Sequence, residues 1–88
     1  MNAVITVIGT DKVGILASIS TACANARVNI EEVTQSILRG MFAMIMLVTL
    51  PDDLTIEELS SRLNEAGEKL ELRITVTRQE IYDVTHKV

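Results

Sequence analysis

A short segment between an apolar run and a helical pattern holds the residue types best suited to binding a small molecule. The segment is Thr10-Asp11-Lys12-Val13-Gly14-Ile15-Leu16, between the apolar run Val4 to Ile8 and a helical spacing over Ile15 to Ala26. Such a strand–turn–helix junction leaves backbone N–H groups unpaired at the start of the helix. Gly14 has no Cβ, so a ligand can approach the main chain closely there. No neighbouring residue offers a catalytic group, so the segment predicts binding rather than a reaction.

Two interpretations of this junction are open. In the first, Gly14 only allows helix and sheet to pack closely, and Asp11 caps the helix, as Asp commonly does. In the second, the N–H groups of residues 13–16 receive a carboxylate, with help from the helix dipole. Asp11 would repel an anion but attract an ammonium group, so a zwitterion fits the segment better than a phosphate. Lys12 is expected to be solvated or to help neutralise the carboxylate.

The other reactive residue types lack the neighbours that catalysis or metal binding needs. Cys23 lies between two alanines on the helical pattern and is expected to be a small buried hydrophobic residue rather than a nucleophile. His86 has no second His or Cys nearby, so no metal site is expected. Glu31 and Glu32 are adjacent on an expected strand and should point to opposite faces, so they cannot share a substrate. We therefore expect no enzyme activity, no catalytic residue and no cofactor.

Size and charge argue against several classes of function. The 88 residues are 48% hydrophobic and 23% charged, as in a single globular domain, for which we expect a core over residues 2–78 and a tail over 79–88. A net charge of −4 without a Lys/Arg cluster argues against nucleic acid as a partner. The longest apolar run, Met41 to Val48, is too short to span a membrane, and the start lacks a basic, signal-like segment. With one cysteine, the chain is expected in the cytoplasm.

Hydrophobic spacing predicts the strands that must position the binding segment. Four strands are expected, over residues 4–8, 30–38, 41–50 and 72–77. The second mixes charged and apolar residues, so it should be half exposed. The third is apolar on both faces and should therefore be central in the sheet.

Helical signals separate these strands. Apolar residues recur on one helix face between Ile15 and Ala26. Thr55 followed by Glu58 is a capping-box pattern that opens a second helix. The spacing from Ile81 onward predicts a last helical turn or two.

The resulting order, β-α-β-β-α-β, predicts an α+β protein with the ferredoxin-like plan. Right-handed crossovers would place both helices on one face of a four-stranded antiparallel sheet. The other face, carrying Thr6 and Thr34, would be left uncovered or be covered by a partner. Because so small a core is marginal, burial of a sheet edge or face in a dimer would be a natural supplement.

The segment Asp11-Lys12-Val13-Gly14-Ile15-Leu16, followed by Val28-Asn29-Ile30, resembles ACT domains, which are small regulatory modules in amino-acid metabolism. The resemblance spans essentially the whole chain. The chain is similar in particular to stand-alone, single-ACT-domain proteins of uncharacterised function, which share the stretch around residues 3–15 and the tail Glu80-Ile81-Tyr82-Asp83. We therefore expect a single ACT-like domain over residues 1–88.

This resemblance implies a homodimer with ligand pockets between the first strand–helix loop of one protomer and the start of the second strand of another. Amino acids are the usual ligands, held mainly by backbone groups. The ligand-binding residues implied here are Asp11, Lys12, Val13, Gly14, Ile15, Leu16, Asn29 and Ile30. Asn29 has an alternative interpretation as a turn residue that bonds the local backbone.

Arg27 departs from the pattern of the family, because relatives often carry glycine just after the first helix. A left-handed conformation there costs a non-glycine residue about 1 kcal/mol or more. Either the helix ends differently in this chain or Arg27 adopts the strained conformation.

Three function hypotheses follow. The first is a regulatory module that binds a small molecule, plausibly an amino acid, at a homodimer interface. The second is a dimerisation or docking module for a metabolic enzyme or regulator, with no ligand of its own. The third is an acylphosphatase-like hydrolase, which we disfavour because the loop from Thr10 to Leu16 contains Asp11 and no Arg.

Overall fold

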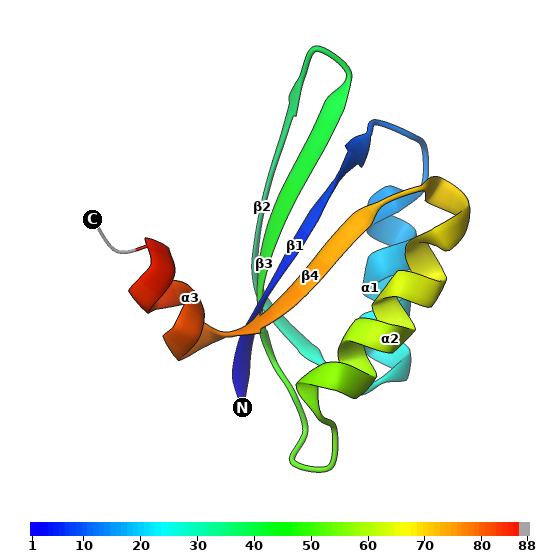
Figure 1. Cartoon of the computed structure of the whole chain (residues 1–88). Coiled ribbons are helices and arrows are strands. Elements are labelled where there is room, and N and C mark those ends of the chain that lie inside the picture. The colour runs from blue at the N-terminus through cyan, green and yellow to red at the C-terminus, as the bar shows by residue number, and fades with distance from the viewer. Residues whose placement is uncertain (87–88) are drawn as a thin grey trace.

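Two βαβ units build a four-stranded antiparallel sheet with two helices packed on one of its faces (Figure 1). The computed structural model describes residues 1–86, so residues 87–88 of the predicted C-terminal helical pattern lie outside the described chain. The elements are β1 (Asn2–Thr10), α1 (Ile15–Asn25), β2 (Asn29–Leu38), β3 (Met41–Thr49), α2 (Ile56–Gly67), the 3-10 turn η1 (Glu68–Leu70), β4 (Arg73–Arg78) and α3 (Gln79–His86). This order confirms the predicted ferredoxin-like plan.

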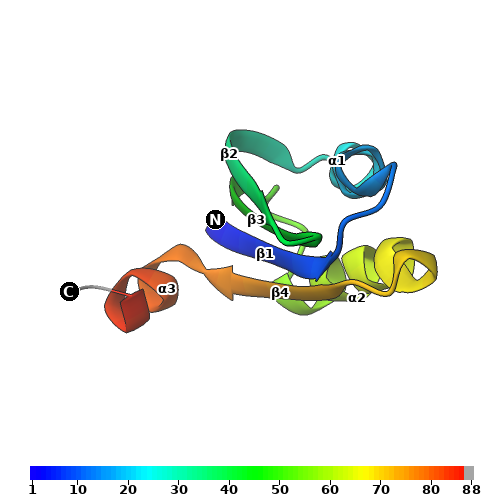
Figure 2. The ribbon, with the colours of Figure 1, turned by 90° about the horizontal axis from the view of Figure 1, so that it is seen from above.

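The sheet has the strand order β2-β3-β1-β4, and all neighbouring strands are antiparallel. β3 is central, as its apolar residues on both faces predicted, and β2 and β4 are the edges. Seen from above, α1 and α2 lie on one side of the sheet and α3 lies on the other (Figure 2). The segment from Thr10 to Leu16 leaves β1 on the helix side, beside the turn between β2 and β3.

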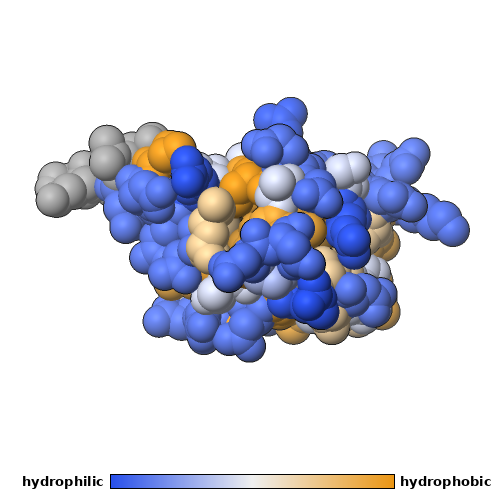
Figure 3. All heavy atoms as spheres, turned by 90° about the horizontal axis from the view of Figure 1, so that it is seen from below, coloured by the Kyte–Doolittle hydropathy of each residue, from blue (hydrophilic) through white to orange (hydrophobic). Residues whose placement is uncertain are grey.

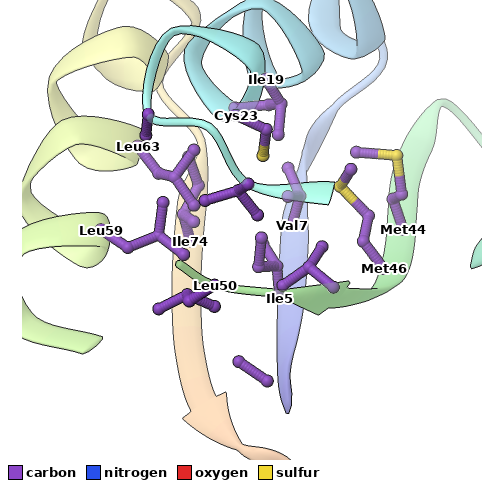
Figure 4. Packing of buried hydrophobic residues seen from close by; sticks show 14 of the residues in the cluster. Ile5, Val7, Ile19, Cys23, Met44, Met46, Leu50, Leu59, Leu63 and Ile74 are labelled. Carbon is purple, nitrogen blue, oxygen red and sulfur yellow. The ribbon is translucent and has the colours of Figure 1, made fainter. Parts of the chain in front are cut away.

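The hydrophobic core lies between the sheet and the two helices. Figure 4 shows that side chains of β1 and β3 point toward α1, and that side chains of α2 and β4 lie beside them. The residues concerned are Ile5, Val7, Met44 and Met46 of the sheet, Ile19 and Cys23 of α1, Leu59 and Leu63 of α2, and Ile74 of β4. Cys23 is fully buried in this cluster, as its position between alanines predicted. The core is aliphatic apart from Phe42, because the chain has only two aromatic residues.

The start of α2 forms the capping box that the sequence predicted. The Thr55 hydroxyl accepts a hydrogen bond from the backbone N–H of Glu58 at 3.1 Å, and the Glu58 carboxylate accepts one from the backbone N–H of Thr55 at 3.3 Å. Among residues 1–86, no helix is long and apolar enough to cross a bilayer.

Arg27 adopts the left-handed conformation, with φ of 60°. The chain therefore turns as it would at a glycine, and the first of the two alternatives for this position is wrong. The guanidinium of Arg27 donates to both carboxylate oxygens of Asp53, at 3.0 and 2.8 Å. This ion pair joins the α1–β2 turn to the β3–α2 loop.

A β-bulge near the start of β2 overturns the expected separation of Glu31 and Glu32. Strict alternation placed these two side chains on opposite faces, but the register with β3 shifts between Ile30 and Glu32. The bulge frees Glu31 from the alternation, and its carboxylate accepts hydrogen bonds from Thr49 and Asn29.

Candidate functional site

The first helix begins without a side-chain cap. Gly14 stands at the N-cap position in the left-handed region, with φ of 92°, and its carbonyl accepts the first helical hydrogen bond from the Ser18 N–H at 2.9 Å. No side chain in the described part of the chain caps this helix, and no acidic residue lies in its first turn. The interpretation of Asp11 as a helix cap is therefore wrong. The first backbone N–H groups of α1 have no intrahelical partner and remain available to a ligand.

Two contacts anchor the β1–α1 loop, one to the β2–β3 turn and one to the end of η1. The backbone N–H of Asp11 donates to the carbonyl of Gly40 at 2.8 Å. The Lys12 ammonium donates to the carbonyl of Leu70 at 3.1 Å and lies 3.5 Å from the Glu71 carboxylate. The expectation that Lys12 is solvated is therefore wrong, because its ammonium group has partners at Leu70 and Glu71.

A groove of about 440 Å³ opens at this helix start and extends to the edge strand β2. Its lining residues are Asp11, Lys12, Gly14, Ile15, Leu16, Gln35, Ser36, Ile37 and Phe42. The structure thus brings together five of the predicted residues of the loop and helix start. Val13 is not among them, since its side chain is fully exposed to solvent.

The residues from β2 and β3 that line the groove were not among the sequence candidates. They lie there because the turn at Arg39-Gly40 folds the end of β2 back beside β3, and β3 pairs with β1. Ile37 pairs with Phe42, and Phe42 pairs with Gly9, so a row of partners connects the edge strand to the β1–α1 loop. The predicted fold already implied that these residues lie near the loop. The first and second strands both run antiparallel to the third, so they finish at the same end of the sheet.

Asn29 and Ile30 lie at the opposite end of β2 from the groove. The side-chain amide of Asn29 donates to the Glu31 carboxylate at 3.0 Å, and the Thr49 hydroxyl donates to the same oxygen at 3.2 Å. Ile30 is half buried and packs against the core. Within one chain, these two residues therefore do not meet the loop residues.

The groove has the chemistry of a binding site. Ile15, Leu16, Ile37 and Phe42 provide apolar surface, and the uncapped helix start provides N–H donors with a favourable dipole for an anion. Among the described residues, no group of three or more His, Cys, Asp or Glu side chains is placed to hold a metal ion. Burial raises the pKa of the Cys23 thiol to about 11, which opposes formation of a reactive thiolate.

Comparison with protein families gives a match over almost the whole chain. Residues 2–77 match the family described as ACT domain. A UPF0237 protein of Methanopyrus kandleri is 42% identical over 87 residues, which cover 98% of this chain and 97% of that protein.

Solved structures show the same architecture. An ACT domain protein from Streptococcus pneumoniae superposes with a TM-score of 0.83 at 30% identity, covering 94% of each chain. The regulatory subunit of aspartate kinase from Thermus thermophilus superposes with a TM-score of 0.70 at 20% identity, covering 86% of this chain and 50% of that one. The second likeness concerns the fold alone.

Proposed function

Because this chain belongs to the ACT domain family, whose members are generally regulatory modules that bind small molecules, we propose that it binds an amino acid between two of its copies. One observation carries the proposal. The uncapped start of α1 opens onto an apolar groove that reaches the free edge of the sheet. A ligand in this groove has N–H donors at one end and apolar walls along its length.

A second copy would supply the side of the groove that one chain leaves open. β2 is an edge strand, so its outward N–H and C=O groups are unpaired with another strand of the same sheet. Antiparallel pairing of β2 with β2 of another copy brings the start of one strand beside the end of the other. Asn29 and Ile30 of one copy would then approach Gln35 to Ile37 of the other, beside the groove.

The arrangement of charges favours a zwitterion over a simple anion. The N–H groups at the start of α1 attract a carboxylate. Asp11 lies at the same end of the groove and would attract an α-ammonium group. Lys12 is already partnered by Leu70 and Glu71, so its charge is not required for the ligand.

The test is a calorimetric and thermal-shift screen of the twenty common amino acids against the full chain. We expect at least one of them to bind and to raise the unfolding temperature, because a ligand that binds only the folded state stabilises it. No binding by any of them at millimolar concentration would contradict the proposal.

Gly14 and Gly40 offer a matched pair of variants for this screen. Both glycines have positive φ, and a Cβ at either position would meet no atom within 4 Å. Gly14→Ala and Gly40→Ala should therefore each cost about 1 kcal/mol of stability. Only Gly14→Ala places a methyl group beside the N–H groups at the start of α1, so we expect it alone to weaken binding, by tenfold or more. Equal affinities would show that the ligand lies elsewhere.

A docking module without a ligand is the second candidate function. The exposed apolar side chains of β2, including Val33, Ile37 and Leu38, favour association with another protein surface. If Gly14→Ala leaves assembly and partner binding unchanged and no ligand is found, this second function is the better description.

A further inference from the structure

The groove at the start of α1 has walls made of apolar side chains that the fold does not bury. Leu16 of α1 is 41% exposed and Ile37 of β2 is 59% exposed, and both line the groove. The other two apolar lining residues, Ile15 and Phe42, belong to the buried core. Removal of apolar surface from water is favourable in proportion to the area covered. An apolar group placed in the groove would therefore be stabilised by contact with Leu16 and Ile37.

The opposite end of the molecule, which carries the N-terminus and the β3–α2 loop, has a different surface. Seen from below, hydrophilic side chains cover most of that end, and apolar surface is confined to patches between them (Figure 3). The acidic residues in the first turn of α2, Glu57 and Glu58, follow this loop. The groove differs from that end because its walls combine exposed apolar side chains with the N–H donors of a helix start.

The charged groups that line the groove match the main-chain groups of an amino acid and leave nothing for a charged side chain. The N–H groups at the start of α1 suit a carboxylate, and Asp11 suits an ammonium group. Lys12 lines the groove too, but its ammonium group already has partners at the end of η1. The polar lining residues from β2, Gln35 and Ser36, are uncharged. Among the described residues that line the groove, none offers an unpaired charge to the side chain of a bound amino acid.

We propose that the groove selects amino acids with apolar side chains, and that Leu16 and Ile37 determine this selectivity. The inference rests on the proposed function and adds the class of ligand. An aliphatic side chain would cover Leu16 and Ile37 and gain the free energy of burying apolar surface. A charged or amide side chain would give up hydrogen bonds with water that these two residues cannot replace.

Leucine and asparagine test this selectivity, because their side chains have nearly the same shape. Each branches at Cγ into two heavy atoms, which are methyl groups in leucine and an oxygen and a nitrogen in asparagine. Both ligands present the same α-carboxylate and α-ammonium groups to the helix start and Asp11. In calorimetry with the full chain, we expect the dissociation constant of leucine to be lower by about tenfold or more.

The outcomes of this comparison separate the selectivity from the proposed function. Equal affinity for the two ligands, tighter binding of asparagine, or binding of polar amino acids alone would overturn the selectivity and leave the amino-acid site in place. If none of the twenty amino acids binds, the proposed function fails, and the selectivity fails with it.

Ile37 and Leu38 offer a matched pair of substitutions, because they are neighbours on β2 and face opposite sides of the sheet. Ile37 pairs with Phe42, which lines the groove, whereas Leu38 pairs with Met41 and does not line the groove. Both side chains are exposed and threonine is favourable in strands, so both variants should keep the fold, which circular dichroism would verify. We expect Ile37→Thr to lower the preference for leucine by about fivefold, and Leu38→Thr to leave it unchanged.

The ratio of the two affinities is the decisive measurement, because a loss of folding or assembly would weaken both ligands alike. Leu16→Gln gives a second test on the opposite wall, since glutamine is a good helix former of similar size. It should lower the preference for leucine as Ile37→Thr does. A ratio that stays at the native value in both variants would show that these walls do not select the ligand.

Discussion

Arg27 occupies the left-handed region at φ of 60°, where a side chain costs about 1 kcal/mol relative to glycine. Its ion pair with Asp53 joins one guanidinium nitrogen to both carboxylate oxygens and is exposed, and such pairs contribute about 0.2 to 1 kcal/mol. The two effects are of similar size and opposite sign. We therefore predict that Arg27→Gly changes the free energy of unfolding by less than about 1 kcal/mol, as measured by urea denaturation.

Asp53→Asn separates the two effects, because it weakens the ion pair and leaves the backbone of Arg27 unchanged. In that background, Arg27→Gly should be stabilising by up to about 1 kcal/mol, since only the relief of strain remains. A destabilising effect of Arg27→Gly in both backgrounds would show that the arginine stabilises the fold through contacts other than Asp53.

The thiol of Cys23 gives a prediction for alkaline pH. Burial raises its pKa from 9.0 to about 11 in the folded chain, so the folded state holds the proton more tightly than the unfolded state does. Below pH 9 both states are protonated and the group has no effect on stability. Between pH 9 and 11 the unfolded thiol ionises first, which lowers the free energy of unfolding by roughly 2 to 3 kcal/mol.

Cys23→Ala removes the ionisable thiol, so a comparison of its stability with that of the native chain isolates the effect of Cys23. All other side chains are the same in the two proteins, so their contributions cancel in the comparison. The difference in unfolding free energy between the native chain and Cys23→Ala should therefore shrink as the pH rises from 9 to 11. A difference that is constant over this range would contradict the burial of the thiol.

At the scale of elements, the spacing of apolar residues predicted the strands and the two packed helices, because the residues with that spacing are the ones that the fold buries. The apolar run from Met41 has no polar face, and a strand of that kind is stable only in the middle of a sheet. The Thr55 and Glu58 spacing identified the start of α2 because both capping bonds are local. The bulge at Glu31 escaped prediction, since it depends on the register with β3 and not on the residues of β2 alone.

The candidate site was predictable in part for the same reason. The loop around Gly14 can be read from the sequence, whereas its neighbours come from residues distant along the chain. Ile37 and Phe42 line the groove through pairing across the sheet. Lys12 bonds to Leu70, which lies 58 residues further along the chain, and local spacing carries no signal for that contact.

The bond from Lys12 to Leu70 links the β1–α1 loop to the end of η1, and a substitution can test its contribution. Lys12→Met should remove about 1 kcal/mol of local stabilisation, because a hydrogen bond from a charged group is lost at a partly exposed site. Amide hydrogen exchange at residues 11–14 and 70–72 should then accelerate about fivefold. Lys69→Met, at an exposed position on η1, is the control and should leave this exchange unchanged. Unchanged exchange in Lys12→Met as well would show that the backbone holds the loop without this side chain.

At the scale of the whole molecule, many large apolar side chains are exposed to solvent, where they contribute nothing to the stability of a monomer. Side chains on β2, at the start of α1 and on the sheet face opposite the two packed helices remain accessible, although a buried core lies beneath them. Burying them in an interface adds hydrophobic stabilisation that a chain of 88 residues cannot obtain from its own core. Association and folding should therefore be coupled in this protein.

Coupled folding and association make the unfolding temperature depend on protein concentration. For a dimer that unfolds to two chains, a tenfold increase in concentration stabilises the dimer by about 1.4 kcal/mol, or about 0.7 kcal/mol per chain. In a domain of this size, that amount raises the unfolding temperature by roughly 3 to 5 °C. Calorimetry from micromolar to near-millimolar protein should show this rise in the native chain and in Thr21→Lys, a control at an exposed position on α1. If the unfolding temperature is the same at every concentration, the stable folded unit is a single chain, and the proposed interface between copies is wrong.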